Sequence, residues 1–125
     1  MPATSSAPMI QQKFDKIMPE LPLSDVAAGV AHYRDVLGFS VNYEMKGFAV
    51  MDRDRARILL ITKTQKHQGI GSCYVYVADA DALHAEYVAK GANVEAAPVS
   101  RPWGLREFRV FDPEANIITF GQPLW

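Results

Sequence analysis

The sequence predicts an α+β fold in which two βαβββ modules form a curved mixed sheet around a cleft. A helical pattern occurs twice, three strand-like segments follow each copy, and the length of 125 residues suits one compact domain. A βαβββ module leaves one face of its sheet uncovered. Two such modules are therefore expected to pair and to leave a cleft between them.

The first helical pattern lies in LPLSDVAAGVAHYRDVLGFSV, where it follows a short apolar stretch. Ser24 or Asp25 is placed to cap the helix, and Gly38 is placed to end it. Between them, apolar side chains recur at helical spacing: Val26, Val30, Tyr33 and Leu37. This strand and helix open a first module that spans about residues 17–63.

The second copy of the pattern lies in VYVADADALHAEYVAKGANV. Asp79 takes the place of Asp25 and Tyr87 takes that of Tyr33, both at an offset of 54 residues. The second module therefore spans about residues 70–122.

Strand-like segments follow each helix. They are SVNYEM, GFAVMD and RILLITK in the first module, and NVEAAP, EFRVFD and NIITFG in the second. Turn sequences separate several of them: Lys46-Gly47, the charged DRDRA stretch and Asp112-Pro113.

Composition limits the function classes. The formal net charge of -1 provides no basic surface for nucleic acid, and no apolar run approaches the ~20 residues of a membrane helix. Cys73 is the single cysteine, which is typical of a reducing compartment, so we expect a cytoplasmic protein. Residues 1–16 predict a flexible N-terminal tail, followed by one domain over residues 17–125.

Alternation along one predicted strand separates two sets of side chains. Tyr74 and Tyr76 share one face, while Cys73, Val75 and Val77 share the other. The apolar set suits the face beneath a helix. The two tyrosines are therefore expected on the cleft side.

Two segments, DVAAGVAHYRDVLGFS and PWGLREFRVFDPEANIITF, together resemble the vicinal-oxygen-chelate superfamily. This superfamily holds glyoxalase I, extradiol dioxygenases, fosfomycin-resistance enzymes and bleomycin-resistance proteins. The series Trp-Gly, Arg-Glu-Phe, Asp-Pro and Asn is most similar to the bleomycin-resistance branch. The resemblance spans roughly Met18 to Gly121 and implies the glyoxalase/bleomycin-resistance fold.

Enzymes of this superfamily hold a divalent metal with His, Glu or Gln side chains on equivalent strands of the two modules. The resemblance places these positions at Met18 and Ser72 and near Leu60 and Thr119, and the neighbours on either side, such as Leu59 and Ile61, supply no better donors. A thioether, an aliphatic chain and two hydroxyls do not supply the oxygen and imidazole donors that such a site needs. We therefore expect no metal, no cofactor and no catalytic residue.

The resemblance also implies that Tyr43, Phe48 and Trp103 line a ligand cleft. The full set of candidate ligand-binding residues is Tyr43, Phe48, Tyr74, Tyr76, Trp103 and Arg106. Two alternatives stay open. An aromatic residue on a curved sheet is often part of the core, and Arg106 and Glu107 could pair with neighbouring side chains or with ligand.

The turn before the last strand carries a departure from the family. Ala115 stands where members usually carry glycine, so the resemblance implies a slightly different turn here. Asn116 is expected to take the turn or left-handed conformation.

Three functions compete. The first is a non-catalytic protein that sequesters a bleomycin-like or other aromatic antibiotic and so gives resistance. The second is a metal-dependent lyase or dioxygenase, and the third is a metabolite-binding domain with no role in resistance. The absent metal donors and the aromatic cleft positions favour the first. The 13 basic and 14 acidic side chains weaken the case for bleomycin itself, because bleomycin-resistance proteins share a strongly acidic surface.

Assembly follows from the same resemblance. Bleomycin-resistance proteins resemble one another in being dimers whose N-terminal strands cross between subunits, with a ligand groove formed between chains. Pro19 falls where such a protein carries a hinge proline, and Pro22 follows it. We expect a homodimer that binds a small aromatic or glycopeptide-like ligand, with the segment before Pro19 exchanged. The alternative is that both prolines only mark an edge strand.

Overall fold

The structure is a computed structural model that describes residues 12–125. Within these residues the first module contains β1 (Glu20–Leu23), α1 (Val26–Asp35), β2 (Ser40–Met45), β3 (Phe48–Arg53) and β4 (Ala56–Thr62). The second module contains β5 (Ser72–Tyr76), α2 (Ala80–Ala89), β6 (Asn93–Val94), β7 (Val99–Ser100), β8 (Leu105–Phe111) and β9 (Ile117–Pro123). Both modules follow the βαβββ order, with β6 and β7 sharing one place in it.

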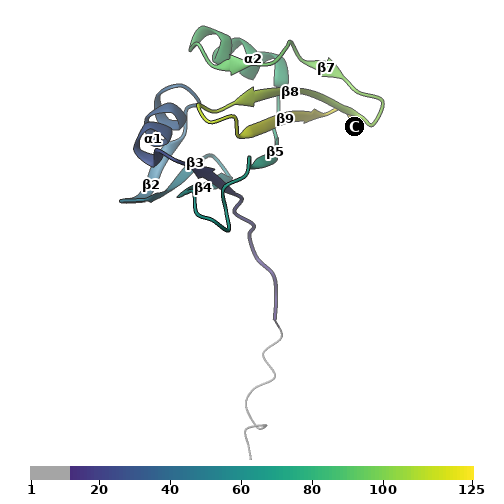
Figure 1. The fold of residues 1–125 in the computed structure, drawn as a ribbon. Helices are drawn as coiled ribbons and strands as arrows, with labels where there is room; N and C mark the ends of the chain where they lie inside the picture. The colour runs from purple at the N-terminus through teal and green to yellow at the C-terminus, as the bar shows by residue number, and fades with distance from the viewer. Residues whose placement is uncertain (1–11) are drawn as a thin grey trace, which may run out of the picture.

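Each module folds into its own mixed sheet (Figure 1). The strand order is β1-β4-β3-β2 in the first sheet and β5-β9-β8-β6 in the second, where β7 also pairs with β8. In both sheets the strand before the helix lies parallel to the last strand of the module, and the other pairs are antiparallel. The predicted α+β fold of two βαβββ modules is confirmed. Within the part of the chain described, neither helix is long and apolar enough to cross a membrane.

The helices begin and end where the sequence predicts. Asp25 and Asp79 are the N-caps, and each carboxylate accepts a 3.0 Å hydrogen bond from the backbone N–H three residues later. Gly38 and Gly91 follow the two helices with φ values of 78° and 77°, which glycine adopts without the steric cost that a Cβ imposes.

The core lies between each helix and the face of the sheet beneath it. The α1 side chains Val26, Val30 and Tyr33 are buried, and so is Leu37, which lies just beyond the end of the helix. In the second module Tyr87 packs on Phe108 and Phe120, whose rings stack at 5.5 Å. Aromatic pairs of this kind contribute ~0.5–1.5 kcal/mol beyond the burial of their area.

Two tyrosines on the two helices join the modules. The Tyr33 hydroxyl donates to the Asp112 carboxylate at 3.0 Å, and the Tyr87 hydroxyl donates to the Leu37 carbonyl at 2.8 Å. Burial raises the pKa of both, in Tyr87 to about 12. Both hydroxyls therefore stay protonated and act as buried donors between modules.

A second contact joins the turn between β8 and β9 to the start of α1. The Glu114 carboxylate accepts hydrogen bonds from the backbone N–H groups of Ser24 at 2.8 Å and Asp25 at 3.1 Å, and from the Ser24 hydroxyl at 2.6 Å. Lys63 lies 3.4 Å away. Burial alone would raise the pKa of Glu114, but these donors outweigh it and lower the pKa to about 2.

Two local expectations are wrong. NVEAAP does not form one strand, because hydrogen bonding to β8 ends with the Glu95 N–H, the chain bends at residues 96–97, and Pro98 has no N–H to donate. In the β8–β9 turn the left-handed residue is Ala115, at φ 69°, and not Asn116. Asn116 is buried instead, where its amide donates to Pro22 and Asp112 and accepts from Gly71.

Candidate functional site

The open face of the second sheet carries exposed tyrosines. Tyr74 and Tyr76 are 41% and 65% exposed, and their ring centroids lie 5.5 Å apart. On the other face of β5, Cys73, Val75 and Val77 pack against the core. The predicted division of the strand into a helix face and an open face is confirmed.

A carboxylate lies among these rings. The Tyr74 hydroxyl donates a 2.7 Å hydrogen bond to Glu107 on β8, and the Tyr74 ring crosses β9 at Gly121 to reach it. Burial and the Glu107 carboxylate raise the pKa of Tyr74, so its hydroxyl remains a donor at neutral pH. Arg101 approaches Glu107 at 3.6 Å.

Trp103 extends this face. Its side chain is 62% exposed, and the Arg101 guanidinium lies 5.9 Å from its ring centroid. Next to it, the Trp125 ring packs over Gly104, where an added Cβ would come within 3.2 Å of that ring. We call Tyr74, Tyr76 and Trp103 the second-module aromatic surface.

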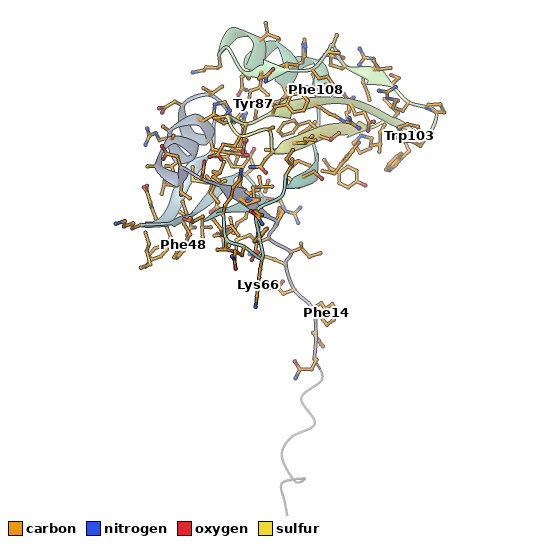
Figure 2. The ribbon with its side chains drawn as sticks, viewed as in Figure 1. Phe14, Phe48, Lys66, Tyr87, Trp103 and Phe108 are labelled. Atoms are coloured by element: carbon orange, nitrogen blue, oxygen red, sulfur yellow. The ribbon has the colours of Figure 1, made fainter. Side chains whose placement is uncertain are left out.

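Tyr43 and Phe48 form a separate pair on β2 and β3, with ring centroids 5.8 Å apart and Tyr43 52% exposed. We call them the first-module aromatic pair. Phe48 projects from the first sheet, whereas Trp103 lies at the far end of the second (Figure 2). One chain therefore presents two aromatic surfaces on two sheets, and does not bring them together.

Arg106 lies away from this surface. It follows the same alternation as the buried Phe108 and Val110, which places it on the helix side of β8. There its guanidinium donates to both carboxylate oxygens of Asp81 on α2, at 2.9 and 3.0 Å. The structure thus favours the ion-pair alternative for Arg106, and Glu107 takes its place on the open face.

The positions assigned to a metal carry no suitable donors. Leu60 is fully buried under α1, so its neighbours Leu59 and Ile61 are the residues of β4 on the open face. Neither neighbour supplies a metal donor, because both side chains are aliphatic. Among residues 12–125, no group of three His, Cys, Asp or Glu side chains is placed to hold a metal ion.

The sequence did not point to Arg101, Gly121 or Trp125, and it named Glu107 only as a residue that could pair with neighbouring side chains or with ligand. Glu107 had one available signal, since it alternates with the core residues Phe108 and Val110 and must face the opposite side. Gly121 had none, because its role depends on a ring that reaches it from the neighbouring strand.

The matches to known proteins agree with this architecture. The model of the Glyoxalase/Bleomycin resistance protein/Dioxygenase superfamily matches residues 13–120. The chain belongs to this superfamily. The resemblance inferred from the sequence is therefore confirmed, together with its fold.

Among relatives, a bleomycin resistance protein of Geobacillus stearothermophilus is 26% identical over 126 residues, covering 86% of this chain and 96% of the relative. A bleomycin resistance protein of Staphylococcus aureus matches equally well. Among solved structures, the bleomycin-binding protein of Streptomyces verticillus, in complex with copper(II)-bleomycin, has a TM-score of 0.76 and 30% identity over 88% of this chain and 97% of that one. The bleomycin resistance determinant of transposon Tn5 has a TM-score of 0.77, covers 90% and 100%, and at 19% identity supports the fold alone.

Proposed function

We propose that this protein is a non-catalytic binding protein that sequesters a bleomycin-like or other flat aromatic antibiotic in the cytoplasm. The observation that carries the proposal is the pair of exposed aromatic surfaces on the open faces of the two sheets. Rigid aromatic walls provide large contact area for planar ligands at a low cost in side-chain entropy. The relatives that bind or resist bleomycin support the same ligand class.

The donor set supports the non-catalytic part of the proposal. The metal positions of the superfamily carry thioether, aliphatic and hydroxyl side chains here, and these do not support Lewis-acid catalysis. The carboxylate on the open face, Glu107, already accepts a hydrogen bond from the Tyr74 hydroxyl and lies beside Arg101. These side chains therefore argue against a metal-dependent lyase or dioxygenase function.

The proposed site is shared between two copies. Tyr43 and Phe48 of one chain would face Tyr74, Tyr76 and Trp103 of a second chain across a groove, because a single chain holds the two sets on separate sheets. A twofold homodimer then contains two equivalent grooves. The segment before β1, residues 12–18, which we call the arm, supports this arrangement. Its apolar side chains Phe14 and Ile17 are 99% and 91% exposed within one chain.

The test is a titration of the purified protein with metal-free bleomycin and with a panel of flat aromatic compounds. Tryptophan fluorescence measures the binding. The chain has two tryptophans, so Trp125→Phe isolates the Trp103 signal. Saturable binding at about micromolar affinity or tighter is expected, with the ligand recovered unaltered by mass spectrometry. A stoichiometric transition metal together with a modified product would contradict the proposal.

A further inference from the structure

A cavity of about 450 Å³ lies between the β3–β4 turn and α2. Its floor is aromatic and deeply buried: Phe39, Tyr87 and Phe120. These residues belong to the helix side of the sheets, whereas the two aromatic surfaces lie on the open sides. The volume falls within the range of small-molecule sites, and the cavity is separate from the proposed antibiotic groove except at Tyr76, which lies at its mouth.

The internal repeat explains why the space is empty. The offset that relates Tyr33 to Tyr87 also relates the start of α1 to the start of α2, and both helices carry an Asp N-cap. At α1 the space is filled by the β8–β9 turn, which runs through residues 112–116. The corresponding β3–β4 turn has only residues 54–55 between its strands, and it leaves the space at α2 open.

The filled half shows which chemical group suits this position. There the Glu114 carboxylate accepts from the backbone N–H groups of Ser24 and Asp25. The equivalent residues at α2 are Ala78 and Asp79, which line the cavity, and their N–H groups have no protein acceptor within residues 12–125.

A cation is available at the rim. Arg55 lines the cavity and is exposed, and within residues 12–125 it forms no ion pair. Its neighbour Arg53 is committed to Glu86, which it contacts at 2.7 and 3.0 Å. A carboxylate that entered the cavity could pair with Arg55 without displacing an existing partner.

We propose that this cavity binds a small aromatic carboxylic acid. The ring would lie on Phe39, Tyr87 and Phe120, and the carboxylate would lie toward the Ala78 and Asp79 amides and Arg55, as Glu114 does in the other half of the chain. This is a second binding site, on the helix side of the sheets, and Tyr76 is the one residue named for both sites.

The experiment is an amide chemical-shift titration of the isotopically labelled full-length protein with naphthoate, and in parallel with the uncharged naphthamide. Saturable shifts are expected at Arg55, Ala78, Asp79 and Ala82, with naphthamide bound at least about fivefold more weakly. Ala82→Phe, at the rim of the cavity, should weaken naphthoate binding by about tenfold or more, and Arg55→Gln should remove most of the preference over naphthamide. Trp103→Ala removes part of the other aromatic surface, so the naphthoate shifts at Arg55, Ala78, Asp79 and Ala82 should saturate at the same concentration in this variant as in the unmodified protein.

Three results would each overturn the proposal. They are shifts that map to Tyr74 and Trp103 in place of α2, equal affinity for the acid and the amide, and unaltered binding to Ala82→Phe. If Ala82→Phe does not fold, the Arg55→Gln titration and the shift map decide by themselves. Loss of bleomycin binding in the groove assay would leave all of these measurements interpretable.

Discussion

The Tyr74 hydroxyl on β5 donates a 2.7 Å hydrogen bond to Glu107 on β8, across the intervening strand β9. The contact is possible because β9 carries Gly121 at the crossing point. An added Cβ there would overlap the Tyr74 hydroxyl and its ring. A glycine on the middle strand therefore holds one wall of the proposed groove flat against the sheet.

Gly121→Ala tests this relationship. The Tyr74 ring would have to move off the sheet and lose Glu107, so we expect a loss of roughly 1–3 kcal/mol in the free energy of unfolding and a clear drop in affinity for planar ligands. Gly69→Ala is the matched control, because a Cβ at Gly69 meets nothing within 4 Å. Chemical denaturation and ligand titration measure both effects. Equal stability and equal ligand affinity in Gly121→Ala and Gly69→Ala would refute the role given to Gly121.

Trp103→Ala should separate binding from stability. The side chain is 62% exposed, so its removal should change the free energy of unfolding by less than about 1 kcal/mol. The affinity for aromatic ligands should fall by about tenfold or more. Phe108→Ala is the contrasting variant, since Phe108 is 4% exposed and its loss should cost about 3–5 kcal/mol. A large stability loss in Trp103→Ala with unchanged affinity per folded molecule would make Trp103 a core residue.

The sequence predicted what local periodicity controls. Both helix caps, the buried stripe of α1 and the alternation along β5 depend on neighbours within a few residues, and all of them are confirmed. The βαβββ order of elements along each module followed from the repeat. These features need no knowledge of which segments meet in space.

What could not be predicted depends on contacts between distant segments. Arg106 pairs with Asp81, which lies 25 residues earlier on α2, and no local pattern indicates this partner. Leu60 shows the sensitivity of strand register, because an error of one residue exchanges the open face for the buried face. The Glu114 contact with Ser24 joins opposite ends of the chain and is equally invisible to periodicity.

Glu114 should give the protein a measurable acid dependence. Its folded pKa of about 2 lies below its ordinary value of 4.5, so its contribution is complete above about pH 4.5 and is lost as the pH falls toward 2. Glu114→Gln should lower the free energy of unfolding by roughly 1–3 kcal/mol at neutral pH and flatten its dependence on pH in that window. Glu44→Gln, at an exposed residue of β2, is the control. Parallel pH profiles for Glu114→Gln and the unmodified protein would count against the contact.

Ala115→Gly should stabilise the protein. Ala115 has a φ of 69°, and an L-residue with a Cβ pays about 1–2 kcal/mol in this left-handed region. The greater freedom of glycine in the unfolded chain offsets part of this gain, so we expect a net increase of about 0.5–1 kcal/mol. Ala27→Gly on the exposed side of α1 should instead cost about 1 kcal/mol. Thermal and denaturant unfolding distinguish the two signs.

The arm before β1 should control assembly. β1 is an edge strand that pairs with its own β4, and Pro22 is tolerated there because its outer side has no strand partner within residues 12–125. Before Pro19, whose carbonyl still accepts a 2.9 Å hydrogen bond from Leu59 on β4, residues 12–18 run away from both sheets (Figure 1), which leaves Phe14 and Ile17 in solvent within a single chain. Two large apolar side chains on such an arm are most simply covered by a second copy.

Light scattering at micromolar concentration should therefore show a species of twice 13.9 kDa. The double variant Phe14→Ser with Ile17→Ser should shift the equilibrium from dimer toward monomer. Its affinity for aromatic ligands should also fall, because the groove needs walls from both chains. The control replaces the exposed neighbours Lys13 and Lys16 with serine and should remain dimeric. A 13.9 kDa species in the unmodified protein would end the dimer proposal, and a dimer that survives the apolar substitutions would show that the arm is not what holds it together.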